Sequence, residues 1–98
     1  MFATFFQWEV HQEREADFIE IWNEATTILL EQGSLGSALF RGSHGHFHAL
    51  ARWPDQVTRD AAFESVRDHP CFTLLRECIR ETSYSEDATE ISNLWRFV

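Results

Sequence analysis

The chain has 98 residues, a length that predicts a single domain over residues 1–98. Its 44% hydrophobic and 14% aromatic content excludes a disordered or collagen-like chain. Its 16 acidic residues outnumber its 8 basic ones, and the net charge of −8 argues against nucleic acid and anionic membrane surfaces as partners, because both bind positive clusters. No apolar run reaches the roughly 18 residues of a membrane span, and no signal-peptide pattern opens the chain, so we expect a cytoplasmic protein.

The first third of the sequence alternates and then changes its period. Residues 2–10 alternate between two faces, which predicts a strand with one apolar face and one mixed face. From about residue 13 to residue 32, apolar residues such as Trp22 recur at helical spacing. Gly33 follows as a candidate C-cap, so we expect the helix to end there.

A hairpin is predicted next. Residues 34–41 and 46–53 alternate like strands, and the turn sequence between them ends in His44-Gly45. The second of these strands is expected to turn an apolar face toward the helices, made of Phe47, Ala49, Ala51 and Trp53.

The remaining sequence predicts a helix broken in two and a closing strand. Asp55 is a candidate cap for a helix that runs to about residue 66, and Pro70 is expected in the first turn of a second helix. The polar residues 81–89 predict a loop, and the apolar residues that follow predict a last strand over 90–98.

The resulting order β-α-β-β-α-β predicts an α+β, ferredoxin-like split βαβ fold, a four-stranded antiparallel sheet with its helices on one face. The other face of the sheet then has no cover and carries Phe5, Leu50 and Phe40. An exposed face that is partly apolar predicts a partner, most simply a second copy of the chain. We therefore expect a homodimer in which two sheets close into a barrel.

Three groups of residues carry a resemblance to a known family. They are the run Gly33-Ser34-Leu35-Gly36-Ser37, then Arg41 with the His44-Gly45 turn, and the ending Ala51-Arg52-Trp53-Pro54-Asp55. In these residues the sequence resembles the antibiotic biosynthesis monooxygenase domain of the dimeric α+β barrel superfamily, from Phe2 to about Ile79. The best-understood members oxidise phenolic polyketides without metal or flavin. The resemblance therefore implies an oxygenase without a cofactor, acting on a small aromatic or conjugated metabolite.

The resemblance also implies where the site lies and what it must do. The family's pocket lies between the sheet and its own helices, and here it would be walled by Phe6, Trp8, Trp22, Phe47, Ala49 and Phe63. A phenolate gives an electron to dioxygen more readily than a phenol does. Such a site therefore needs a cation or hydrogen-bond donors near the substrate oxygen, inside a dry apolar cage.

Half of the family's polar constellation is matched in this chain. Trp53 stands where the family has a Trp that stacks the substrate, and Arg76 corresponds to an Arg that stabilises a developing oxyanion. Ala49 stands where the family has an Asn, and Arg59 where it has a Tyr. Two other functions stay open for this reason, a binding module without catalysis and a structural dimer whose cavity is filled by its own aromatic side chains.

The sharpest local feature is a group of three histidines at the hairpin, His44, His46 and His48. His46 and His48 would share a strand face, as metal-binding pairs do, but zinc or iron needs further ligands whose positions the sequence does not give. We therefore predict no metal and expect polar contacts at the dimer face, with a metal site or pH-linked assembly as the alternatives.

Overall fold

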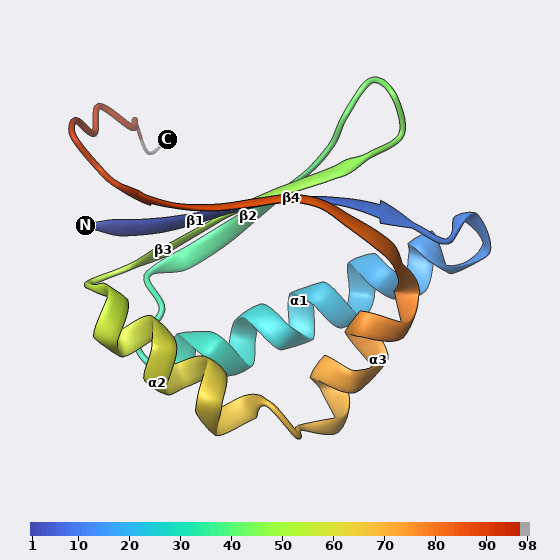
Figure 1. The fold of residues 1–98 in the computed structure, drawn as a ribbon, viewed down its shortest axis with the longest axis horizontal. Coiled ribbons are helices and arrows are strands. Elements are labelled where there is room, and N and C mark those ends of the chain that lie inside the picture. The colour runs from blue at the N-terminus through green and yellow to red at the C-terminus, as the bar shows by residue number, and fades with distance from the viewer. Residues whose placement is uncertain (97–98) are drawn as a thin grey trace.

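The computed structural model describes residues 1–96 and has the expected order of elements, with all three α-helices on one side of a sheet (Figure 1). This arrangement confirms the predicted ferredoxin-like α+β fold. The elements are β1 (Phe2–Val10), a short 3-10 turn η1 (Gln12–Arg14), α1 (Glu15–Glu31), β2 (Gly36–Arg41), β3 (Phe47–Trp53), α2 (Gln56–Val66), α3 (Pro70–Cys78) and β4 (Ile79–Thr89).

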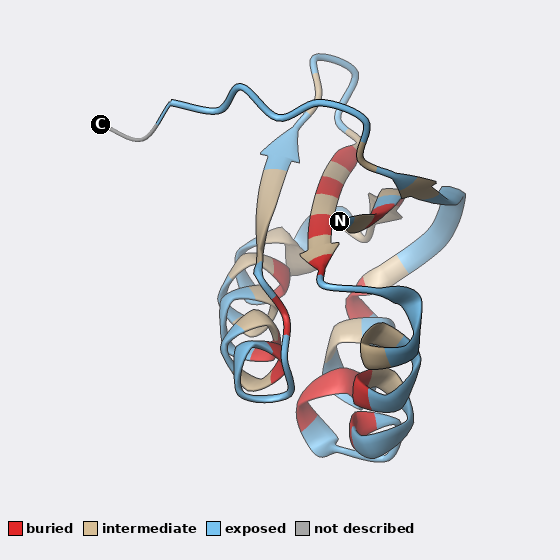
Figure 2. Cartoon of the chain, turned by 90° about the vertical axis from the view of Figure 1, so that its left-hand side faces the viewer, coloured by how far each residue is buried: buried red, intermediate tan, exposed pale blue. Residues whose placement is uncertain are grey.

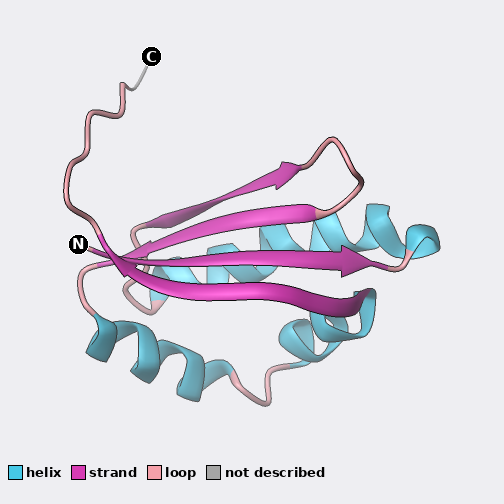
Figure 3. Cartoon of the chain, turned by 45° about the horizontal axis from the view of Figure 1, so that its top comes forward, coloured by secondary structure: helices cyan, strands magenta, loops and turns pink. Residues whose placement is uncertain are grey.

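The four strands pair antiparallel in the order β2-β3-β1-β4 (Figure 3). β1 and β3 are the central strands, with Phe6 opposite Ala49 and Trp8 opposite Phe47. On the outer side of β3, Ser37 of β2 lies opposite Ala51. The register therefore brings residues from three strands together on the face that the helices cover.

The prediction for the last part of the chain is wrong. Residues 81–89, expected as a loop, belong to β4, which pairs with β1 from Ile79 to Thr89. Residues 90–96, expected as a strand, have no regular structure, and Phe97 and Val98 lie outside the described residues. The reason is that β4 is an edge strand with most of its side chains exposed, so backbone pairing holds it and no apolar pattern marks it.

The broken second helix is confirmed, with Asp55 as the cap of its first part and Pro70 in the first turn of its second part, as predicted, whereas the cap by His69 was not predicted. The Asp55 carboxylate accepts a hydrogen bond of 2.7 Å from the backbone N–H of Thr58 at the start of α2. In α3, Pro70 occupies the first turn, and His69 accepts from the N–H of Cys71 through its ring nitrogen. These caps fix where each helix begins beneath the sheet.

The core lies between the sheet and the helices (Figure 2). β3 alternates along its whole length, with the four residues that face the helices buried and those between them half-buried, as predicted. On α1, Phe18 and Ala25 are buried against the sheet. The buried residues form two adjoining clusters, one around Trp53 and α2 and one around Phe18 and Phe47.

The opposite face of the sheet carries the apolar residues predicted for it. Phe5 lies opposite Leu50, and Phe40 lies opposite His48 on the same face. Phe5 is 39% and Phe40 51% exposed. Figure 1 shows no helix on this side, where the C-terminal segment passes over the sheet.

Among the helices of residues 1–96, none combines the length and the apolar composition that crossing a membrane requires.

Candidate functional site

A cavity of about 90 Å³ lies on the helix side of the sheet. Five of the six residues that the sequence predicts for the pocket wall line it, and only Phe47 does not. Its complete lining is Phe6, Trp8, Trp22, Ala25, Thr26, Leu29, Ser37, Ala49, Ala51, Phe63 and Leu75.

Three alanines account for the empty space. Ala49 and Ala51 occupy successive helix-facing positions of β3, and Ala25 is on the buried face of α1. The neighbouring helix-facing positions of β3 carry the large side chains of Phe47 and Trp53, which fill the interior there. Because protein interiors are otherwise close-packed, small side chains on facing elements leave a hole that their larger neighbours enclose.

Aromatic rings form one wall of this cavity. The Phe6 and Trp8 rings on β1 are stacked, with centroids 5.0 Å apart and planes 13° apart. Trp8 in turn meets the buried Phe18 edge-on at 5.7 Å, which holds the wall in place from behind. Such a wall offers flat surfaces and aromatic edges, which suit an aromatic or conjugated ligand.

The two polar residues of the lining are Thr26 and Ser37, neither of which the sequence interpretation assigned to the pocket. Ser37 lies opposite Ala51 and therefore faces the helices. Thr26 lies four residues after Trp22 and three before Leu29, on the same face of α1. A register for the hairpin and the helical spacing would have been enough to find both.

Trp53 is fully buried but does not line the cavity. Its ring packs against Phe63, with centroids 5.7 Å apart, and it is Phe63 that reaches the cavity. The indole Nε1–H of Trp53 has no hydrogen-bond acceptor within the described chain. Such an unpaired buried donor is uncommon and costly. The stacking role expected of Trp53 stays a prediction, and its position is behind the cavity wall.

Arg76 lies away from the cavity, on the exposed side of α3. Its guanidinium donates hydrogen bonds to the backbone oxygen of Arg67 at 3.2 Å and to the Thr73 hydroxyl at 3.4 Å. In this arrangement it joins the turn after α2 to α3. The oxyanion role expected of Arg76 stays a prediction that would require the side chain to turn inward.

Phe47, the remaining predicted wall residue, packs elsewhere in the core. Its ring centroid lies 5.1 Å from that of Phe18, and the Arg41 guanidinium carbon lies 5.1 Å from the same centroid. Phe47 therefore closes the end of the core next to the cavity.

Arg59 is held by an ion pair. Its guanidinium bonds both carboxylate oxygens of Asp87 on β4, at 2.7 and 3.0 Å, and the Thr4 hydroxyl on β1 at 2.9 Å. It also lies over the rings of Phe2 and Phe63, 4.9 and 5.8 Å from their centroids. The hydrogen bond from Arg59 lowers the pKa of Asp87, and the same bond raises the pKa of Arg59. Arg59 thus supports Phe63 from outside the cavity.

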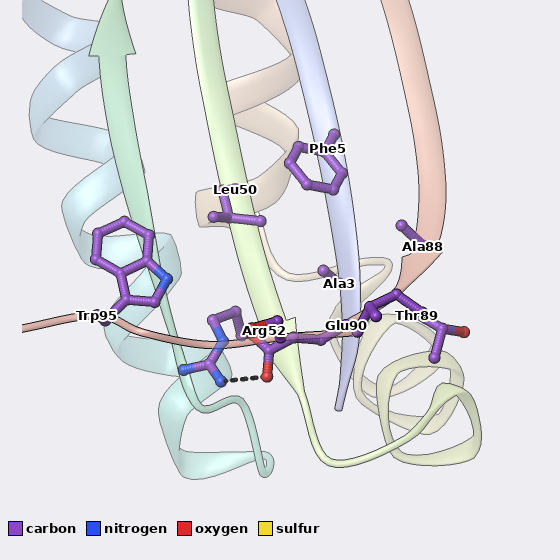
Figure 4. Close-up of a pocket in the computed structure, with 10 residues that line it drawn as sticks. Ala3, Phe5, Leu50, Arg52, Ala88, Thr89, Glu90 and Trp95 are labelled. Atoms are coloured by element: carbon purple, nitrogen blue, oxygen red, sulfur yellow. Dashed lines mark hydrogen bonds and ion pairs between the residues drawn. The ribbon is translucent and has the colours of Figure 1, made fainter.

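A larger hollow of about 410 Å³ lies on the open face of the sheet (Figure 4). Phe5 and Leu50 form its floor, and Trp95 of the C-terminal segment lies at its side. Arg52 pairs with Glu90 of its own chain at 3.1 Å, and its buried Nε has no acceptor within residues 1–96. The carboxylate partner of the Arg52 Nη2 atom is therefore supplied by the same chain.

The histidines of the hairpin do not converge on one point. His46 lies 3.5 Å from the Glu9 carboxylate, and the His48 ring lies near Gly42, where an added Cβ would stand 2.7 Å from Nε2. Over residues 1–96, no group of three or more His, Cys, Asp or Glu side chains is arranged to hold a metal ion.

Solved structures with the same arrangement are similar to this chain along nearly its full length. SnoaB from Streptomyces nogalater, described as a cofactor-independent oxygenase, is 19% identical, with a TM-score of 0.81 and 95% of each chain covered. An antibiotic biosynthesis monooxygenase is 17% identical, with a TM-score of 0.72 over 95% of this chain and 99% of that one. The chain has the fold of the antibiotic biosynthesis monooxygenases.

The same fold occurs in a conserved protein from Methanosarcina mazei, which is 17% identical, with a TM-score of 0.76 and 89% of each chain covered. No model of a protein family matches the sequence, and no curated protein matches it closely. Identities this low establish a shared fold, and function has to be argued from the cavity itself.

Proposed function

We propose that the protein is a cofactor-independent oxygenase that acts on a small aromatic or conjugated molecule bound in the helix-side cavity. The observation that carries the proposal is the apolar cavity walled by the stacked rings of Phe6 and Trp8 and by Trp22 and Phe63. The likeness in fold to SnoaB, itself described as a cofactor-independent oxygenase, adds support.

Among the described residues, the cavity lining supplies hydrogen-bond donors for such a reaction but no cation. In the simplest case a phenol and dioxygen give a quinone and water, so that one oxygen atom enters the ring and the other leaves as water. The substrate donates the electrons, and the apolar wall keeps water away from the radical pair that forms first. The hydroxyls of Thr26 and Ser37 supply hydrogen bonds to the substrate oxygen.

The test is oxygen uptake with a phenol or an anthrone, measured for the unaltered protein and for Ala49→Leu. The added side chain fills the cavity from β3, so we expect uptake to be lost. Val57→Leu is the matched control, because Val57 is 78% exposed on α2 and its substitution should leave uptake unchanged. No uptake with either substrate, or equal uptake in Ala49→Leu, would refute the proposal.

Two further variants test the roles implied for Trp53 and Arg76. If both act in the reaction, Trp53→Phe and Arg76→Ala each lower the uptake rate while circular dichroism stays unchanged. A full rate in Arg76→Ala would assign that side chain to the link between α2 and α3 alone.

A binding module without catalysis is the second candidate. It is favoured by the position of Arg76, whose guanidinium is held at the Arg67 backbone oxygen, and by the absence of a charged side chain from the cavity lining within residues 1–96. Saturable quenching of Trp fluorescence by a phenol, without oxygen uptake, would favour this function over the oxygenase.

We also propose that two copies of the chain pair through the open face of the sheet. Phe5, Phe40 and Tyr84 are between 39% and 51% exposed there, and such an apolar patch is rare on a monomer. Light scattering at micromolar concentration should give twice the chain mass. Phe40→Glu should give a monomer, whereas Val57→Glu on the helix side should not. A monomer in the unaltered protein would overturn the pairing.

A further inference from the structure

We infer that the helix-side cavity selects an uncharged, single-ring aromatic molecule whose oxygen is held by Ser37 and Thr26. The inference rests on the proposed function, since it takes this cavity as the binding site. It adds the size and charge of the ligand and its orientation in the cavity.

The size of the ligand follows from the volume. An apolar cavity of roughly 150 Å³ takes up benzene. The cavity here measures about 90 Å³, which is smaller, so a single ring enters only if the lining moves, and three fused rings would need a much larger movement. Phe6, Trp22 and Phe63 of the lining are half-buried, so their side chains are the large ones that can make that movement.

The orientation of the ligand follows from the order of the strands. Ser37 is on the edge strand β2, the alanines of β3 lie next to it, and the Phe6 and Trp8 wall is on β1 beyond them. Thr26, on the face of α1 that lines the cavity, is the other hydroxyl. A bound ring therefore stacks toward β1, and its oxygen points toward the hydroxyl of Ser37 near the edge of the sheet.

The charge of the ligand follows from the lining. Among the described residues, none that lines the cavity carries a charge. Arg59, which lies over the Phe63 ring behind the cavity wall, is already paired with Asp87. A carboxylate or an ammonium group would lose its water and gain only the hydroxyls of Ser37 and Thr26, with no opposite charge, which disfavours charged ligands. A neutral phenol has no charge to lose its water, and it gains a hydrogen bond in the same cavity.

Binding is measured by titration calorimetry on the full chain with four probes, phenol, toluene, benzoate and anthrone. We expect phenol to bind more tightly than toluene, and benzoate and anthrone not to bind. Ser37→Ala and Thr26→Val should each weaken phenol binding about threefold to tenfold, the effect of one hydrogen bond, and leave toluene binding unchanged. Thr27→Val and Ser43→Ala are the matched controls, because both side chains are exposed outside the cavity and should change neither affinity.

A pH titration gives an independent readout. With 4-nitrophenol as the probe, affinity should fall as the pH rises through the pKa of the probe itself, because only its neutral form suits an uncharged site. The inference fails if anthrone or benzoate binds as tightly as phenol, if the two hydroxyl variants weaken toluene as much as phenol, or if no probe binds. Oxygen uptake with anthrone but not with phenol would leave the proposed oxygenase standing and overturn this ligand class.

Discussion

The ion pair between Arg59 and Asp87 offers the sharpest test of how the helices are fastened to the sheet. It joins α2 to the edge strand β4, and through the Thr4 hydroxyl it also reaches β1. Asp87→Asn keeps the shape of the side chain and removes its charge. We expect this substitution to lower the free energy of unfolding at pH 7.

The magnitude follows from how far the two side chains are exposed. Ion pairs in full contact with water contribute about 0.2–1 kcal/mol. Removing one partner from a fully buried pair costs about 3–5 kcal/mol, because the other charge is left unpaired. The Asp87 side chain is 45% exposed, so water screens it, whereas the Arg59 side chain is only 12% exposed. The expected loss lies between the two limits, at about 1–2 kcal/mol, or roughly 5–15 °C in Tm for a chain of this size.

The pH dependence has a definite sign. The hydrogen bond from Arg59 lowers the pKa of Asp87 in the folded protein, so the pair stabilises the fold at any pH above the ordinary carboxyl value of about 4. As the pH falls further, through the lowered pKa of the folded state, Asp87 takes up a proton and the stabilisation disappears. The protonated carboxyl then resembles the amide of the variant. The difference between the two proteins should therefore vanish in acid.

Urea unfolding, followed by Trp fluorescence at a series of pH values from 7 downward, measures this difference directly. Glu64→Gln is the control, since it makes the same change in net charge and breaks the pair with Arg67, whose members are 67% and 65% exposed. Its effect should stay within about 0.5 kcal/mol. Equal stability of Asp87→Asn and the unaltered protein at pH 7, or a difference that persists in acid, would show that the pair does not fasten α2.

Three further predictions concern caps, turns and thiols. Asp55→Ala should lower Tm by a few degrees, because the N–H of Thr58 loses its acceptor. The stabilisation by Asp55 should fade in acid, since the same hydrogen bond lowers the pKa of Asp55. A Tm unchanged at pH 7 would contradict this prediction. In thermal unfolding Gly33→Ala and Gly45→Ala should each cost about 1–2 kcal/mol for the left-handed backbone, and Gly33→Ala should cost more. Both glycines have positive φ, but an added Cβ at Gly33 would stand 2.8 Å from Thr58 Cγ2 and one at Gly45 would meet nothing within 4 Å, so equal losses would refute the contact. Cys71 should react with a thiol reagent only slowly in the folded protein, because burial raises its pKa, and modification as fast as in urea would refute this.

Much of the fold is written in the sequence as periodicity. β3 and α1 each bury one face, and burial of one face imposes a period of two on a strand and 3.6 on a helix. On β3 the small Ala49 and Ala51 stand between the large Phe47 and Trp53, and the cavity lies at these two alanines.

The same reasoning explains the error at the C-terminus. β4 lies at the edge of the sheet and beyond the cover of the helices, so its residues carry no apolar period. Its place is determined by hydrogen bonds to β1, which any side chain permits. The apolar residues that follow, such as Ile91 and Leu94, are more than 90% exposed and form no strand within the described chain.

The sequence by itself determined which residues face the helices, and therefore the aromatic wall and the alanines of the cavity. Only the tertiary structure decided what the polar residues around it contact. Arg59 bonds Asp87, 28 residues further along the chain, and Arg76 bonds the backbone of Arg67 instead of entering the cavity. Long charged side chains can reach several partners from one backbone position, so local periodicity cannot choose among them, and the choice depends on where the folded chain brings each partner.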